Sequence, residues 1–189
     1  MEKTARLATY SVTALAAAIV VVCFSRAETA QAPNAVAYFA PTGEDRRIHQ
    51  ALEELLESAK REVVIAVYQF TSPELGKLVN KVSKKVKVRV LMDEDQTKGK
   101  YSQAEDLKGD GIELKYVRLP GYGAEREKFH HKFCVIDGEV VATGSFNWTV
   151  LADEKNYENL LILRDPAIAR QYLAEFDRIW ADENITVKK

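Results

Sequence analysis

The sequence has few cysteines, and this shortage excludes two classes of small protein. Only Cys23 and Cys134 are cysteine among 189 residues, and no group of cysteines and histidines has zinc-site spacing. The fold therefore depends neither on a disulfide framework nor on a structural zinc ion, and a domain of this size can bury a sufficient core without them. Cys134 lies in a predicted strand, where we expect a buried apolar residue.

The chain also lacks an excess of positive charge. Its formal net charge is −1, whereas a protein that binds nucleic acid over its whole surface is usually basic. Any phosphate-binding surface must therefore be a local patch. No internal repeat or low-complexity tract is present, and the composition is that of an ordinary globular protein. We expect one domain with a short N-terminal appendage.

The N-terminus resembles a secretory signal. Lys3 and Arg6 precede an uncharged apolar run over residues 12–24, and Ala30-Gln31-Ala32 then offers small residues at the positions that a signal peptidase reads. The run is shorter than the roughly 20 residues that cross a bilayer. If it is extended back to residue 7, an uncleaved anchor that holds the protein at a membrane through residues 7–24 stays open.

These features divide the chain into residues 1–32, a signal peptide or membrane anchor, and residues 33–189, a single domain. We expect the mature protein to be periplasmic or secreted, or held at a membrane if the segment is not removed.

Strands and helices alternate through the first half of the domain. Apolar, β-branched runs predict strands at residues 35–39, 63–70, 86–92 and 112–117, with helical apolar spacing between them. This order is typical of a mainly parallel sheet. Strands at 129–136 and 139–143 then surround Asp137-Gly138, a hairpin turn signal, and a strand at 159–163 precedes a helix from Pro166. The predicted fold class is α/β, a mixed, mainly parallel sheet with helices on both faces.

The predicted hairpin aligns several polar side chains. With a two-residue turn, Lys132 lies opposite Thr143 and His130 lies opposite Ser145, although a bulge would shift this register. Strand side chains alternate between faces, so one face would carry five polar residues. These are His130, Lys132, Thr143, Ser145 and Asn147.

This set of groups suits a phosphodiester. An ammonium neutralises phosphate charge, and hydroxyl and amide donors hold phosphate oxygens. An imidazole can attack phosphorus or transfer a proton near neutral pH. An ordinary hairpin with a mixed polar face is the alternative, but it does not explain why the histidine and lysine align with a Gly-Ser-x-Asn segment.

The motif resembles the HKD signature of the phospholipase D superfamily. It reads His130-x-Lys132, four residues, Asp137, then six residues and Gly144-Ser145-x-Asn147. The chain further resembles the small single-motif bacterial endonucleases of this superfamily and their mitochondrial relatives at residues 66–72, 95–101 and 156–159. The resemblance covers residues 36–182 and implies the phospholipase D/nuclease fold.

The resemblance also implies roles for the site residues. His130 would attack phosphorus and form a phosphohistidine, while a histidine from a second motif protonates the leaving oxygen. Lys132 and Asn147 would hold the phosphate, and Ser145 and Glu158 would orient and polarise the histidine. The chemistry requires no metal or cofactor.

Other candidates have a functional and a structural interpretation. Asp137 either tunes the hairpin or only shapes its turn. Trp148 either stacks on a base or packs in the core. Basic loop residues around the motif either track a nucleic-acid backbone or are solvated: Lys98, Lys100, Arg118, Arg126 and Lys128. We expect Asp93-Glu94-Asp95 to be a solvated strand end rather than a metal site, and His131 to face away from His130.

The sequence therefore predicts a metal-independent phosphodiesterase, with an endonuclease on DNA or RNA as the first hypothesis. The alternatives are a phospholipase D-type hydrolase of lipid phosphodiesters and a non-catalytic nucleic-acid-binding protein. The motif occurs once, whereas the chemistry implied by the resemblance needs two histidines. We therefore expect a homodimer that shares one active site, because a two-fold axis brings the same patch of each chain together.

Overall fold

The computed structural model describes residues 34–108, 111–121 and 125–188. The predicted signal or anchor over residues 1–32 lies outside the described residues. Within them, no helix is both long enough and apolar enough to cross a membrane.

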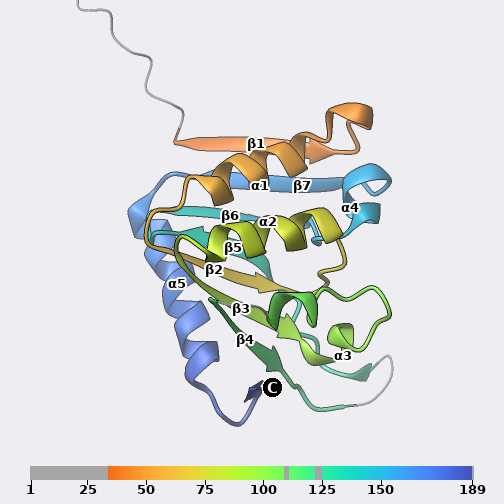
Figure 1. Cartoon of the computed structure of the whole chain (residues 1–189), viewed down its shortest axis with the longest axis vertical. Helices are drawn as coiled ribbons and strands as arrows, with labels where there is room; N and C mark the ends of the chain where they lie inside the picture. The colour runs from red at the N-terminus through yellow and green to blue at the C-terminus, as the bar shows by residue number, and fades with distance from the viewer. Residues whose placement is uncertain (1–33, 109–110, 122–124, 189) are drawn as a thin grey trace, which may run out of the picture. The chain divides into compact units, whose positions relative to one another are not determined.

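The described residues form one eight-stranded sheet in the order β1-β7-β6-β5-β2-β3-β4-β8 (Figure 1). The strands are β1 Ala35–Ala40, β2 Glu62–Val67, β3 Lys87–Asp93, β4 Ile112–Val117, β5 Lys132–Ile136, β6 Val140–Gly144, β7 Glu158–Leu163 and β8 Thr186–Lys188. The helices are α1 Arg47–Glu57, α2 Pro73–Ser83, α3 Glu94–Thr97, α4 Val150–Glu154 and α5 Pro166–Ala181, with 3-10 turns η1 Gly43–Asp45 and η2 Asp106–Lys108.

The sheet is mixed, as predicted, but it is not mainly parallel. Among the described strands, only the pairs β2–β3 and β3–β4 are parallel. The alternation of strands and helices led us to expect a mainly parallel sheet, whereas β1 pairs antiparallel with β7 at the sheet edge. The antiparallel strands β5, β6 and β7 are inserted between β1 and β2. Local periodicity predicts the strands β1 to β7 but misses the short strand β8, and it does not determine which strands are neighbours.

Helices cover both faces of the sheet, which confirms the α/β prediction. On one face, α1 and α2 bury Ile48, Leu52 and Leu75 against the sheet. On the other, α5 buries Phe176 and Ile179 against Phe133, Val135 and Val141, among others. Ser72 caps the N-terminus of α2, and proline follows the cap in both α2 and α5, as helix-start rules lead one to expect.

The β5–β6 turn contains one residue more than predicted. Asp137 and Gly138 both have positive φ, at 56° and 69°, which suits an Asp-Gly hairpin turn. Glu139 also belongs to the turn, so Ile136 pairs with Val140 instead of Glu139. The predicted register is therefore wrong by one residue.

This shift removes Thr143 from the predicted polar face. Thr143 pairs with Phe133, on the α5 side of the sheet, rather than with Lys132. Because β5 begins only at Lys132, His130 lies in the preceding loop. The prediction that His130 lies opposite Ser145 in a continuous ladder is therefore wrong as well.

Strand directions define two edges of the sheet. The strands β1, β2, β3 and β4 all run the same way, since four successive antiparallel pairings connect β1 to β2. We call the side where these strands end the C-terminal edge and the side where they begin the N-terminal edge. The antiparallel strand β5 starts at the C-terminal edge, which therefore receives the loop that carries His130.

Candidate active site

The buried side chain of Lys132 lies at the centre of the C-terminal edge. Lys132 is only 8% exposed, although it carries an ammonium group. Its Nζ donates to the carbonyl oxygen of His130 at 2.9 Å and lies 3.2 Å from His130 Nδ1. The same atom lies 5.3 Å from the centre of the Tyr68 ring. Burial lowers the pKa of Lys132, and the charge of Glu158 opposes this shift.

His130 is exposed beside this lysine. Its ring lies 4.7 Å from the Tyr68 ring, at a tilt of 53°. Partial burial lowers the pKa of His130, and the positive charges of Lys132 and Lys128 lower it further. Asp93 opposes the shift. The imidazole is therefore predominantly neutral at pH 7, as a nucleophile must be.

A short hydrogen-bonded chain joins the ends of β6 and β7. Ser145 Oγ donates to Glu158 Oε2 at 2.5 Å and accepts from the Asn159 amide at 3.1 Å. Asn156 donates to the other oxygen of Glu158 at 3.3 Å. A Cβ at Gly144 would lie 2.2 Å from the Asn159 carbonyl oxygen, so only glycine permits this approach.

Within one chain, Ser145 and Glu158 do not orient His130. The hydrogen bonds that fix the Glu158 carboxylate come from Ser145 and Asn156, and its charge acts on Lys132. No hydrogen bond from either side chain reaches His130 among the described residues.

Asn147 lies beside this network and has unused hydrogen-bonding capacity. Its Oδ1 is buried and has no partner among the described residues. The side chain lines a cavity of about 530 Å³ that also includes Gln69, Tyr101, Leu151 and Asn156. The unpartnered oxygen is an acceptor shielded from solvent, so the group of Asn147 that could bind phosphate oxygens is its Nδ2, which donates hydrogen bonds.

Trp148 holds Asn147 in place from the core. Its backbone bonds to Gln69 and Thr71, and its ring packs edge-on against Phe70 at 5.1 Å. The side chain is 2% exposed. The prediction that Trp148 stacks on a base is therefore wrong, and its core interpretation is correct.

Asp93 positions the loop that leads to His130, a role that the sequence did not reveal. Its carboxylate is fully buried and accepts two hydrogen bonds from Arg126 and one from the Phe129 amide at 3.0 Å. Arg126 also contacts Asp95 at 2.6 Å. The prediction of a solvated strand end is therefore wrong for Asp93, and Arg126 is engaged within the chain.

The other predicted basic residues differ in their availability. Arg118 makes two hydrogen bonds to Glu94, and Lys98 pairs with Asp95 at 2.7 Å. Lys100 lies over the Tyr101 ring. Lys128 is exposed and lines a hollow with His130. Of the predicted substrate-binding residues, Lys128 lies in the same hollow as His130.

Asp137 is remote from this site. It follows β5, whereas His130 precedes it, so the length of the strand, ~17 Å, separates them. The Asp137 carboxylate accepts backbone hydrogen bonds from Lys60, Arg61 and Glu62 at 2.7–2.9 Å. Its contacts are those of a turn residue that ties the hairpin to the start of β2.

The other two histidines make different contacts, although His131 lines the same hollow as His130. His131 contacts the rings of Phe129 and Phe133 and lies 3.8 Å from Glu175 on α5, as its predicted orientation requires. His49 lies 3.5 Å from Asp153, at the start of α1. Among the described residues, no three His, Cys, Asp or Glu side chains are grouped so that they could hold a metal ion.

Tyr68 belongs to the site, although its place in the sequence pattern does not indicate this role. It directly follows β2, its ring contacts both His130 and Lys132, and its hydroxyl accepts from Gln96 at 3.0 Å. An aromatic residue at the end of a buried strand is ordinarily a core residue, so only its membership of the segment 66–72 marked it.

Comparisons with known proteins agree with this geometry. Residues 52–180 match the family described as "Cardiolipin synthase, PLD-like domain". A mitochondrial cardiolipin hydrolase of Xenopus tropicalis is 40% identical over 129 residues, which are 68% of this chain and 59% of that protein. The human mitochondrial cardiolipin hydrolase is 37% identical over 161 residues, 85% of this chain and 61% of that protein. The chain thus spans about three fifths of the length of these relatives.

Two solved structures share the fold. Nuc from Salmonella typhimurium, described as a phospholipase D family member, is 26% identical with a TM-score of 0.65, and the match covers 82% of this chain and 97% of that one. NucT from Helicobacter pylori has a TM-score of 0.71 at 23% identity, covering 82% and 99%. At that identity, the likeness to NucT concerns the fold.

Proposed function

Because this chain belongs to the phospholipase D superfamily, we propose that it is a phosphodiesterase whose nucleophile is His130. The observation that carries the proposal is the contact between the exposed, neutral imidazole of His130 and the buried ammonium of Lys132. A nucleophile and a charge clamp are thereby presented together at one solvent-facing edge.

The reaction would proceed in two displacements. An imidazole lone pair attacks phosphorus, and the bond from phosphorus to the leaving oxygen breaks as a second imidazole donates a proton to that oxygen. Water then attacks the phosphohistidine, releases the phosphorylated product and regenerates His130. Lys132 and Asn147 hold the non-bridging oxygens, whose charge increases in each transition state.

The position of Lys132 influences which ring nitrogen of His130 carries a proton. In the free chain, Lys132 Nζ lies 3.2 Å from Nδ1, and donation to Nδ1 leaves the ring proton on Nε2. That neutral tautomer suits neither role: it has no lone pair on Nε2 to attack phosphorus, and the general acid must be an imidazolium, which carries protons on both nitrogens. If Lys132 turns to a bound phosphate, Nδ1 can carry the proton and the Nε2 lone pair is free to attack.

We propose a homodimer because one chain provides one suitable histidine. The sequence contains three, and the other two face α5 and the start of α1. Across a two-fold axis, the second copy would bring its own His130 to the same phosphate. Exposure of His130 at the sheet edge leaves it accessible to such a partner.

We propose nucleic acid as the first substrate to test. The exposed Lys128 beside His130 suits a polyanionic backbone, and Nuc shares both sequence and fold with this chain. Lipid phosphodiesters are the second candidate, since relatives are named cardiolipin hydrolases. Exposed apolar side chains near Asn147 favour that candidate: Tyr101, Val150 and Leu151. For location, we propose an extracytoplasmic enzyme, or a membrane-anchored one if residues 7–24 are retained.

The test is a parallel assay of the full chain on plasmid DNA, RNA and phospholipid vesicles with chelator present. We expect cleavage of at least one substrate, and a loss of several powers of ten in His130→Ala and Lys132→Ala. Full activity of His130→Ala would refute the mechanism. Tight nucleic-acid binding without cleavage of any substrate would support the non-catalytic alternative.

A further inference from the structure

A strongly basic stretch lies away from the site. Between Glu74 and Asp93 the chain contains six basic residues and no acidic residue, although its net charge is −1. The six are Lys77, Lys81, Lys84, Lys85, Lys87 and Arg89. The stretch covers α2 and most of β3 and contributes nothing to the contacts around His130.

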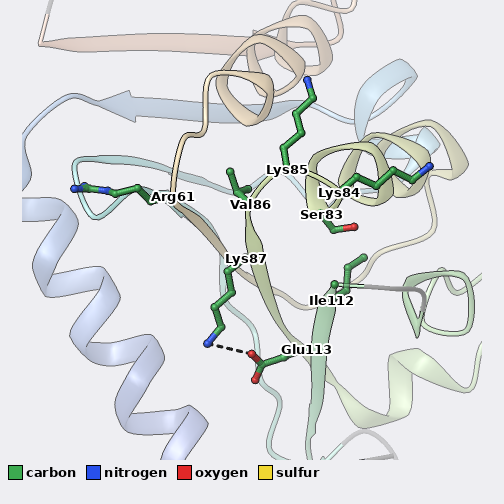
Figure 2. A pocket seen from close by; sticks show the side chains of 9 residues that line it. Arg61, Ser83, Lys84, Lys85, Val86, Lys87, Ile112 and Glu113 are labelled. Atoms are coloured by element: carbon green, nitrogen blue, oxygen red, sulfur yellow. Dashed lines mark ion pairs between the residues drawn. The ribbon is translucent and has the colours of Figure 1, made fainter.

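The end of α2 and the start of β3 bring part of this stretch to the N-terminal edge. Lys84, Lys85 and Lys87 line a shallow hollow of about 590 Å³ together with Arg61, which precedes β2. Figure 2 shows these four side chains spreading outward around it. With the adjacent Lys60, also exposed, they form what we call the basic edge.

Only some of the positively charged side chains of the basic edge form ion pairs within the chain. Lys87 pairs with Glu113 at 3.0 Å, and Arg61 pairs with Glu139 at 2.9 Å (Figure 2 draws the first pair). The remaining members are exposed, and among the described residues no carboxylate lies within ion-pair distance of them. They are Lys60, Lys84 and Lys85. The basic edge therefore retains positive charge for an external partner.

The described chain also begins at this side of the sheet. β1 runs parallel to β2, so its first residue, Ala35, lies at the N-terminal edge, whereas His130 lies at the C-terminal edge. Ten residues, 25–34, separate Ala35 from the apolar run at 12–24. Fully extended, they span at most about 36 Å.

We propose that the basic edge binds a membrane surface that contains anionic lipids. The C-terminal edge, which carries His130 and which we now call the catalytic edge, would face away from that surface. Lysines on flexible stems are attracted to the negative potential of such a surface without needing a shaped pocket. Ala35, where the domain continues from the apolar run in sequence, and the basic edge belong to the same edge of the sheet. The inference goes beyond the proposed function and favours its nucleic-acid form, because an edge that faces away from a bilayer cannot reach the phosphodiesters of that bilayer.

Two other occupants fit less well. No aromatic side chain lines the described hollow, so a single-stranded nucleic acid would find no stacking platform there. A second copy placed across a two-fold axis would set two basic edges against each other, and like charges repel. An anionic lipid surface needs neither aromatic residues nor shape complementarity.

The test locates the membrane with a fluorescent reporter on the full chain. Cys23→Ser leaves the buried Cys134 as the remaining thiol, and a reporter cysteine then replaces Glu113 at the basic edge or Tyr157 at the catalytic edge. Vesicles are phosphatidylcholine, either pure or with about one-third phosphatidylserine, and carry headgroup quenchers. We expect quenching at position 113 on the anionic vesicles, little at position 157, and loss of quenching as salt rises.

A charge-reversal variant with a matched control completes the test. Lys60→Glu/Lys84→Glu/Lys85→Glu should reduce quenching at position 113 to its level on neutral vesicles. Lys98→Glu/Lys100→Glu/Lys155→Glu changes the net charge equally and should leave that quenching intact. The corresponding glutamine variants replace any glutamate variant that does not fold.

Three results would overturn the proposal. Quenching at position 157 instead of 113 would show that the catalytic edge faces the bilayer. Equal quenching at position 113 on neutral and anionic vesicles would show that the basic edge does not bind the surface through the charge of its lipids. A triple variant that loses affinity for duplex DNA while position 113 remains unquenched would identify the basic edge as a nucleic-acid surface.

Discussion

At the scale of single residues, Lys132 is prepared for phosphate before any phosphate binds. Burial removes most of its water, and the His130 carbonyl and the Tyr68 ring replace it only in part. The lowered pKa reflects this loss of solvation. A bound phosphate would supply the missing negative charge, so the interaction should be stronger than that of a solvated lysine.

Lys128 should influence the pH range of the enzyme, together with the burial of His130 and the charge of Lys132. Its charge contributes to the lowered pKa of His130, and the nucleophile must be neutral, so activity should persist to a pH below the ordinary histidine value of about 6.5. Lys128→Gln should raise that pKa and move the acid limb of the kcat profile to higher pH. Lys128→Arg, which keeps the charge, should leave the limb in place. An unshifted limb in Lys128→Gln would contradict this explanation.

Asp137 should matter for stability and not for turnover. Its carboxylate accepts three backbone hydrogen bonds at the turn before β2, far from His130. Asp137→Asn keeps the preference for positive φ but loses one acceptor oxygen and the charge, and should lower the free energy of unfolding by about 1–3 kcal/mol. Denaturant unfolding and kcat of the folded enzyme are the measurements. A large fall in kcat with an unchanged free energy of unfolding would contradict this prediction and show that Asp137 takes part in catalysis.

At the scale of elements, residues 126–129, which lead into His130 and β5, are held by Asp93. The buried carboxylate binds Arg126 and the Phe129 amide, so it fixes the loop immediately before His130. The loop has no strand partner of its own at His130, because β5 starts at Lys132. Its order therefore comes from this ion pair, from the Lys132 ammonium that donates to the His130 carbonyl, and from Tyr68, whose amide donates to the His131 carbonyl and whose ring contacts His130.

Asp93→Asn should therefore impair both stability and catalysis. Removing one partner of a buried ion pair costs about 3–5 kcal/mol, and a loosened loop should lower kcat at least about tenfold. Asp95→Asn is the matched control, since Asp95 is 43% exposed and contacts the same arginine. Thermal unfolding and initial rates on a soluble substrate compare the two. Equal effects of both variants would show that Asp93 has no special role.

Much of this architecture could be predicted, but long-range pairing could not. The strand at 112–117 and the helix start at Pro73 follow from local apolar spacing and capping rules, and both are confirmed. The place of β1 depends on its pairing with β7, more than a hundred residues away in sequence. The hairpin register failed because Glu139 joined the turn, and one residue moves every side chain to the other face.

The site shows the same division. His130, Lys132 and Asn147 are marked by their motif spacing, and the structure places them at one edge of the sheet. Asp93 and Tyr68 reach the site only because β2 and β3 end beside the start of β5. The sequence leaves open whether the Trp148 indole stacks on a base or packs in the core, and its burial in the structure selects the core.

At the scale of the whole molecule, the proposed dimer makes a quantitative prediction. If each active site needs His130 from both chains, a mixed dimer of wild-type and His130→Ala chains is inactive. Random mixing in equal amounts should then leave about one quarter of the wild-type rate per total chain, since about a quarter of dimers are wild type. Independent chains would retain about one half. Rates after subunit exchange, with mass in solution measured in parallel, distinguish the two results.

The central claim is that His130 becomes covalently phosphorylated during turnover. The most direct measurement is rapid quenching of a single turnover under alkaline conditions, followed by mass spectrometry of the peptide that contains His130. We predict a phosphoryl adduct on the His130 imidazole that forms before product release, forms equally in chelator, and is absent from His130→Ala. Rapid turnover with an unmodified His130 at every time point would contradict the account.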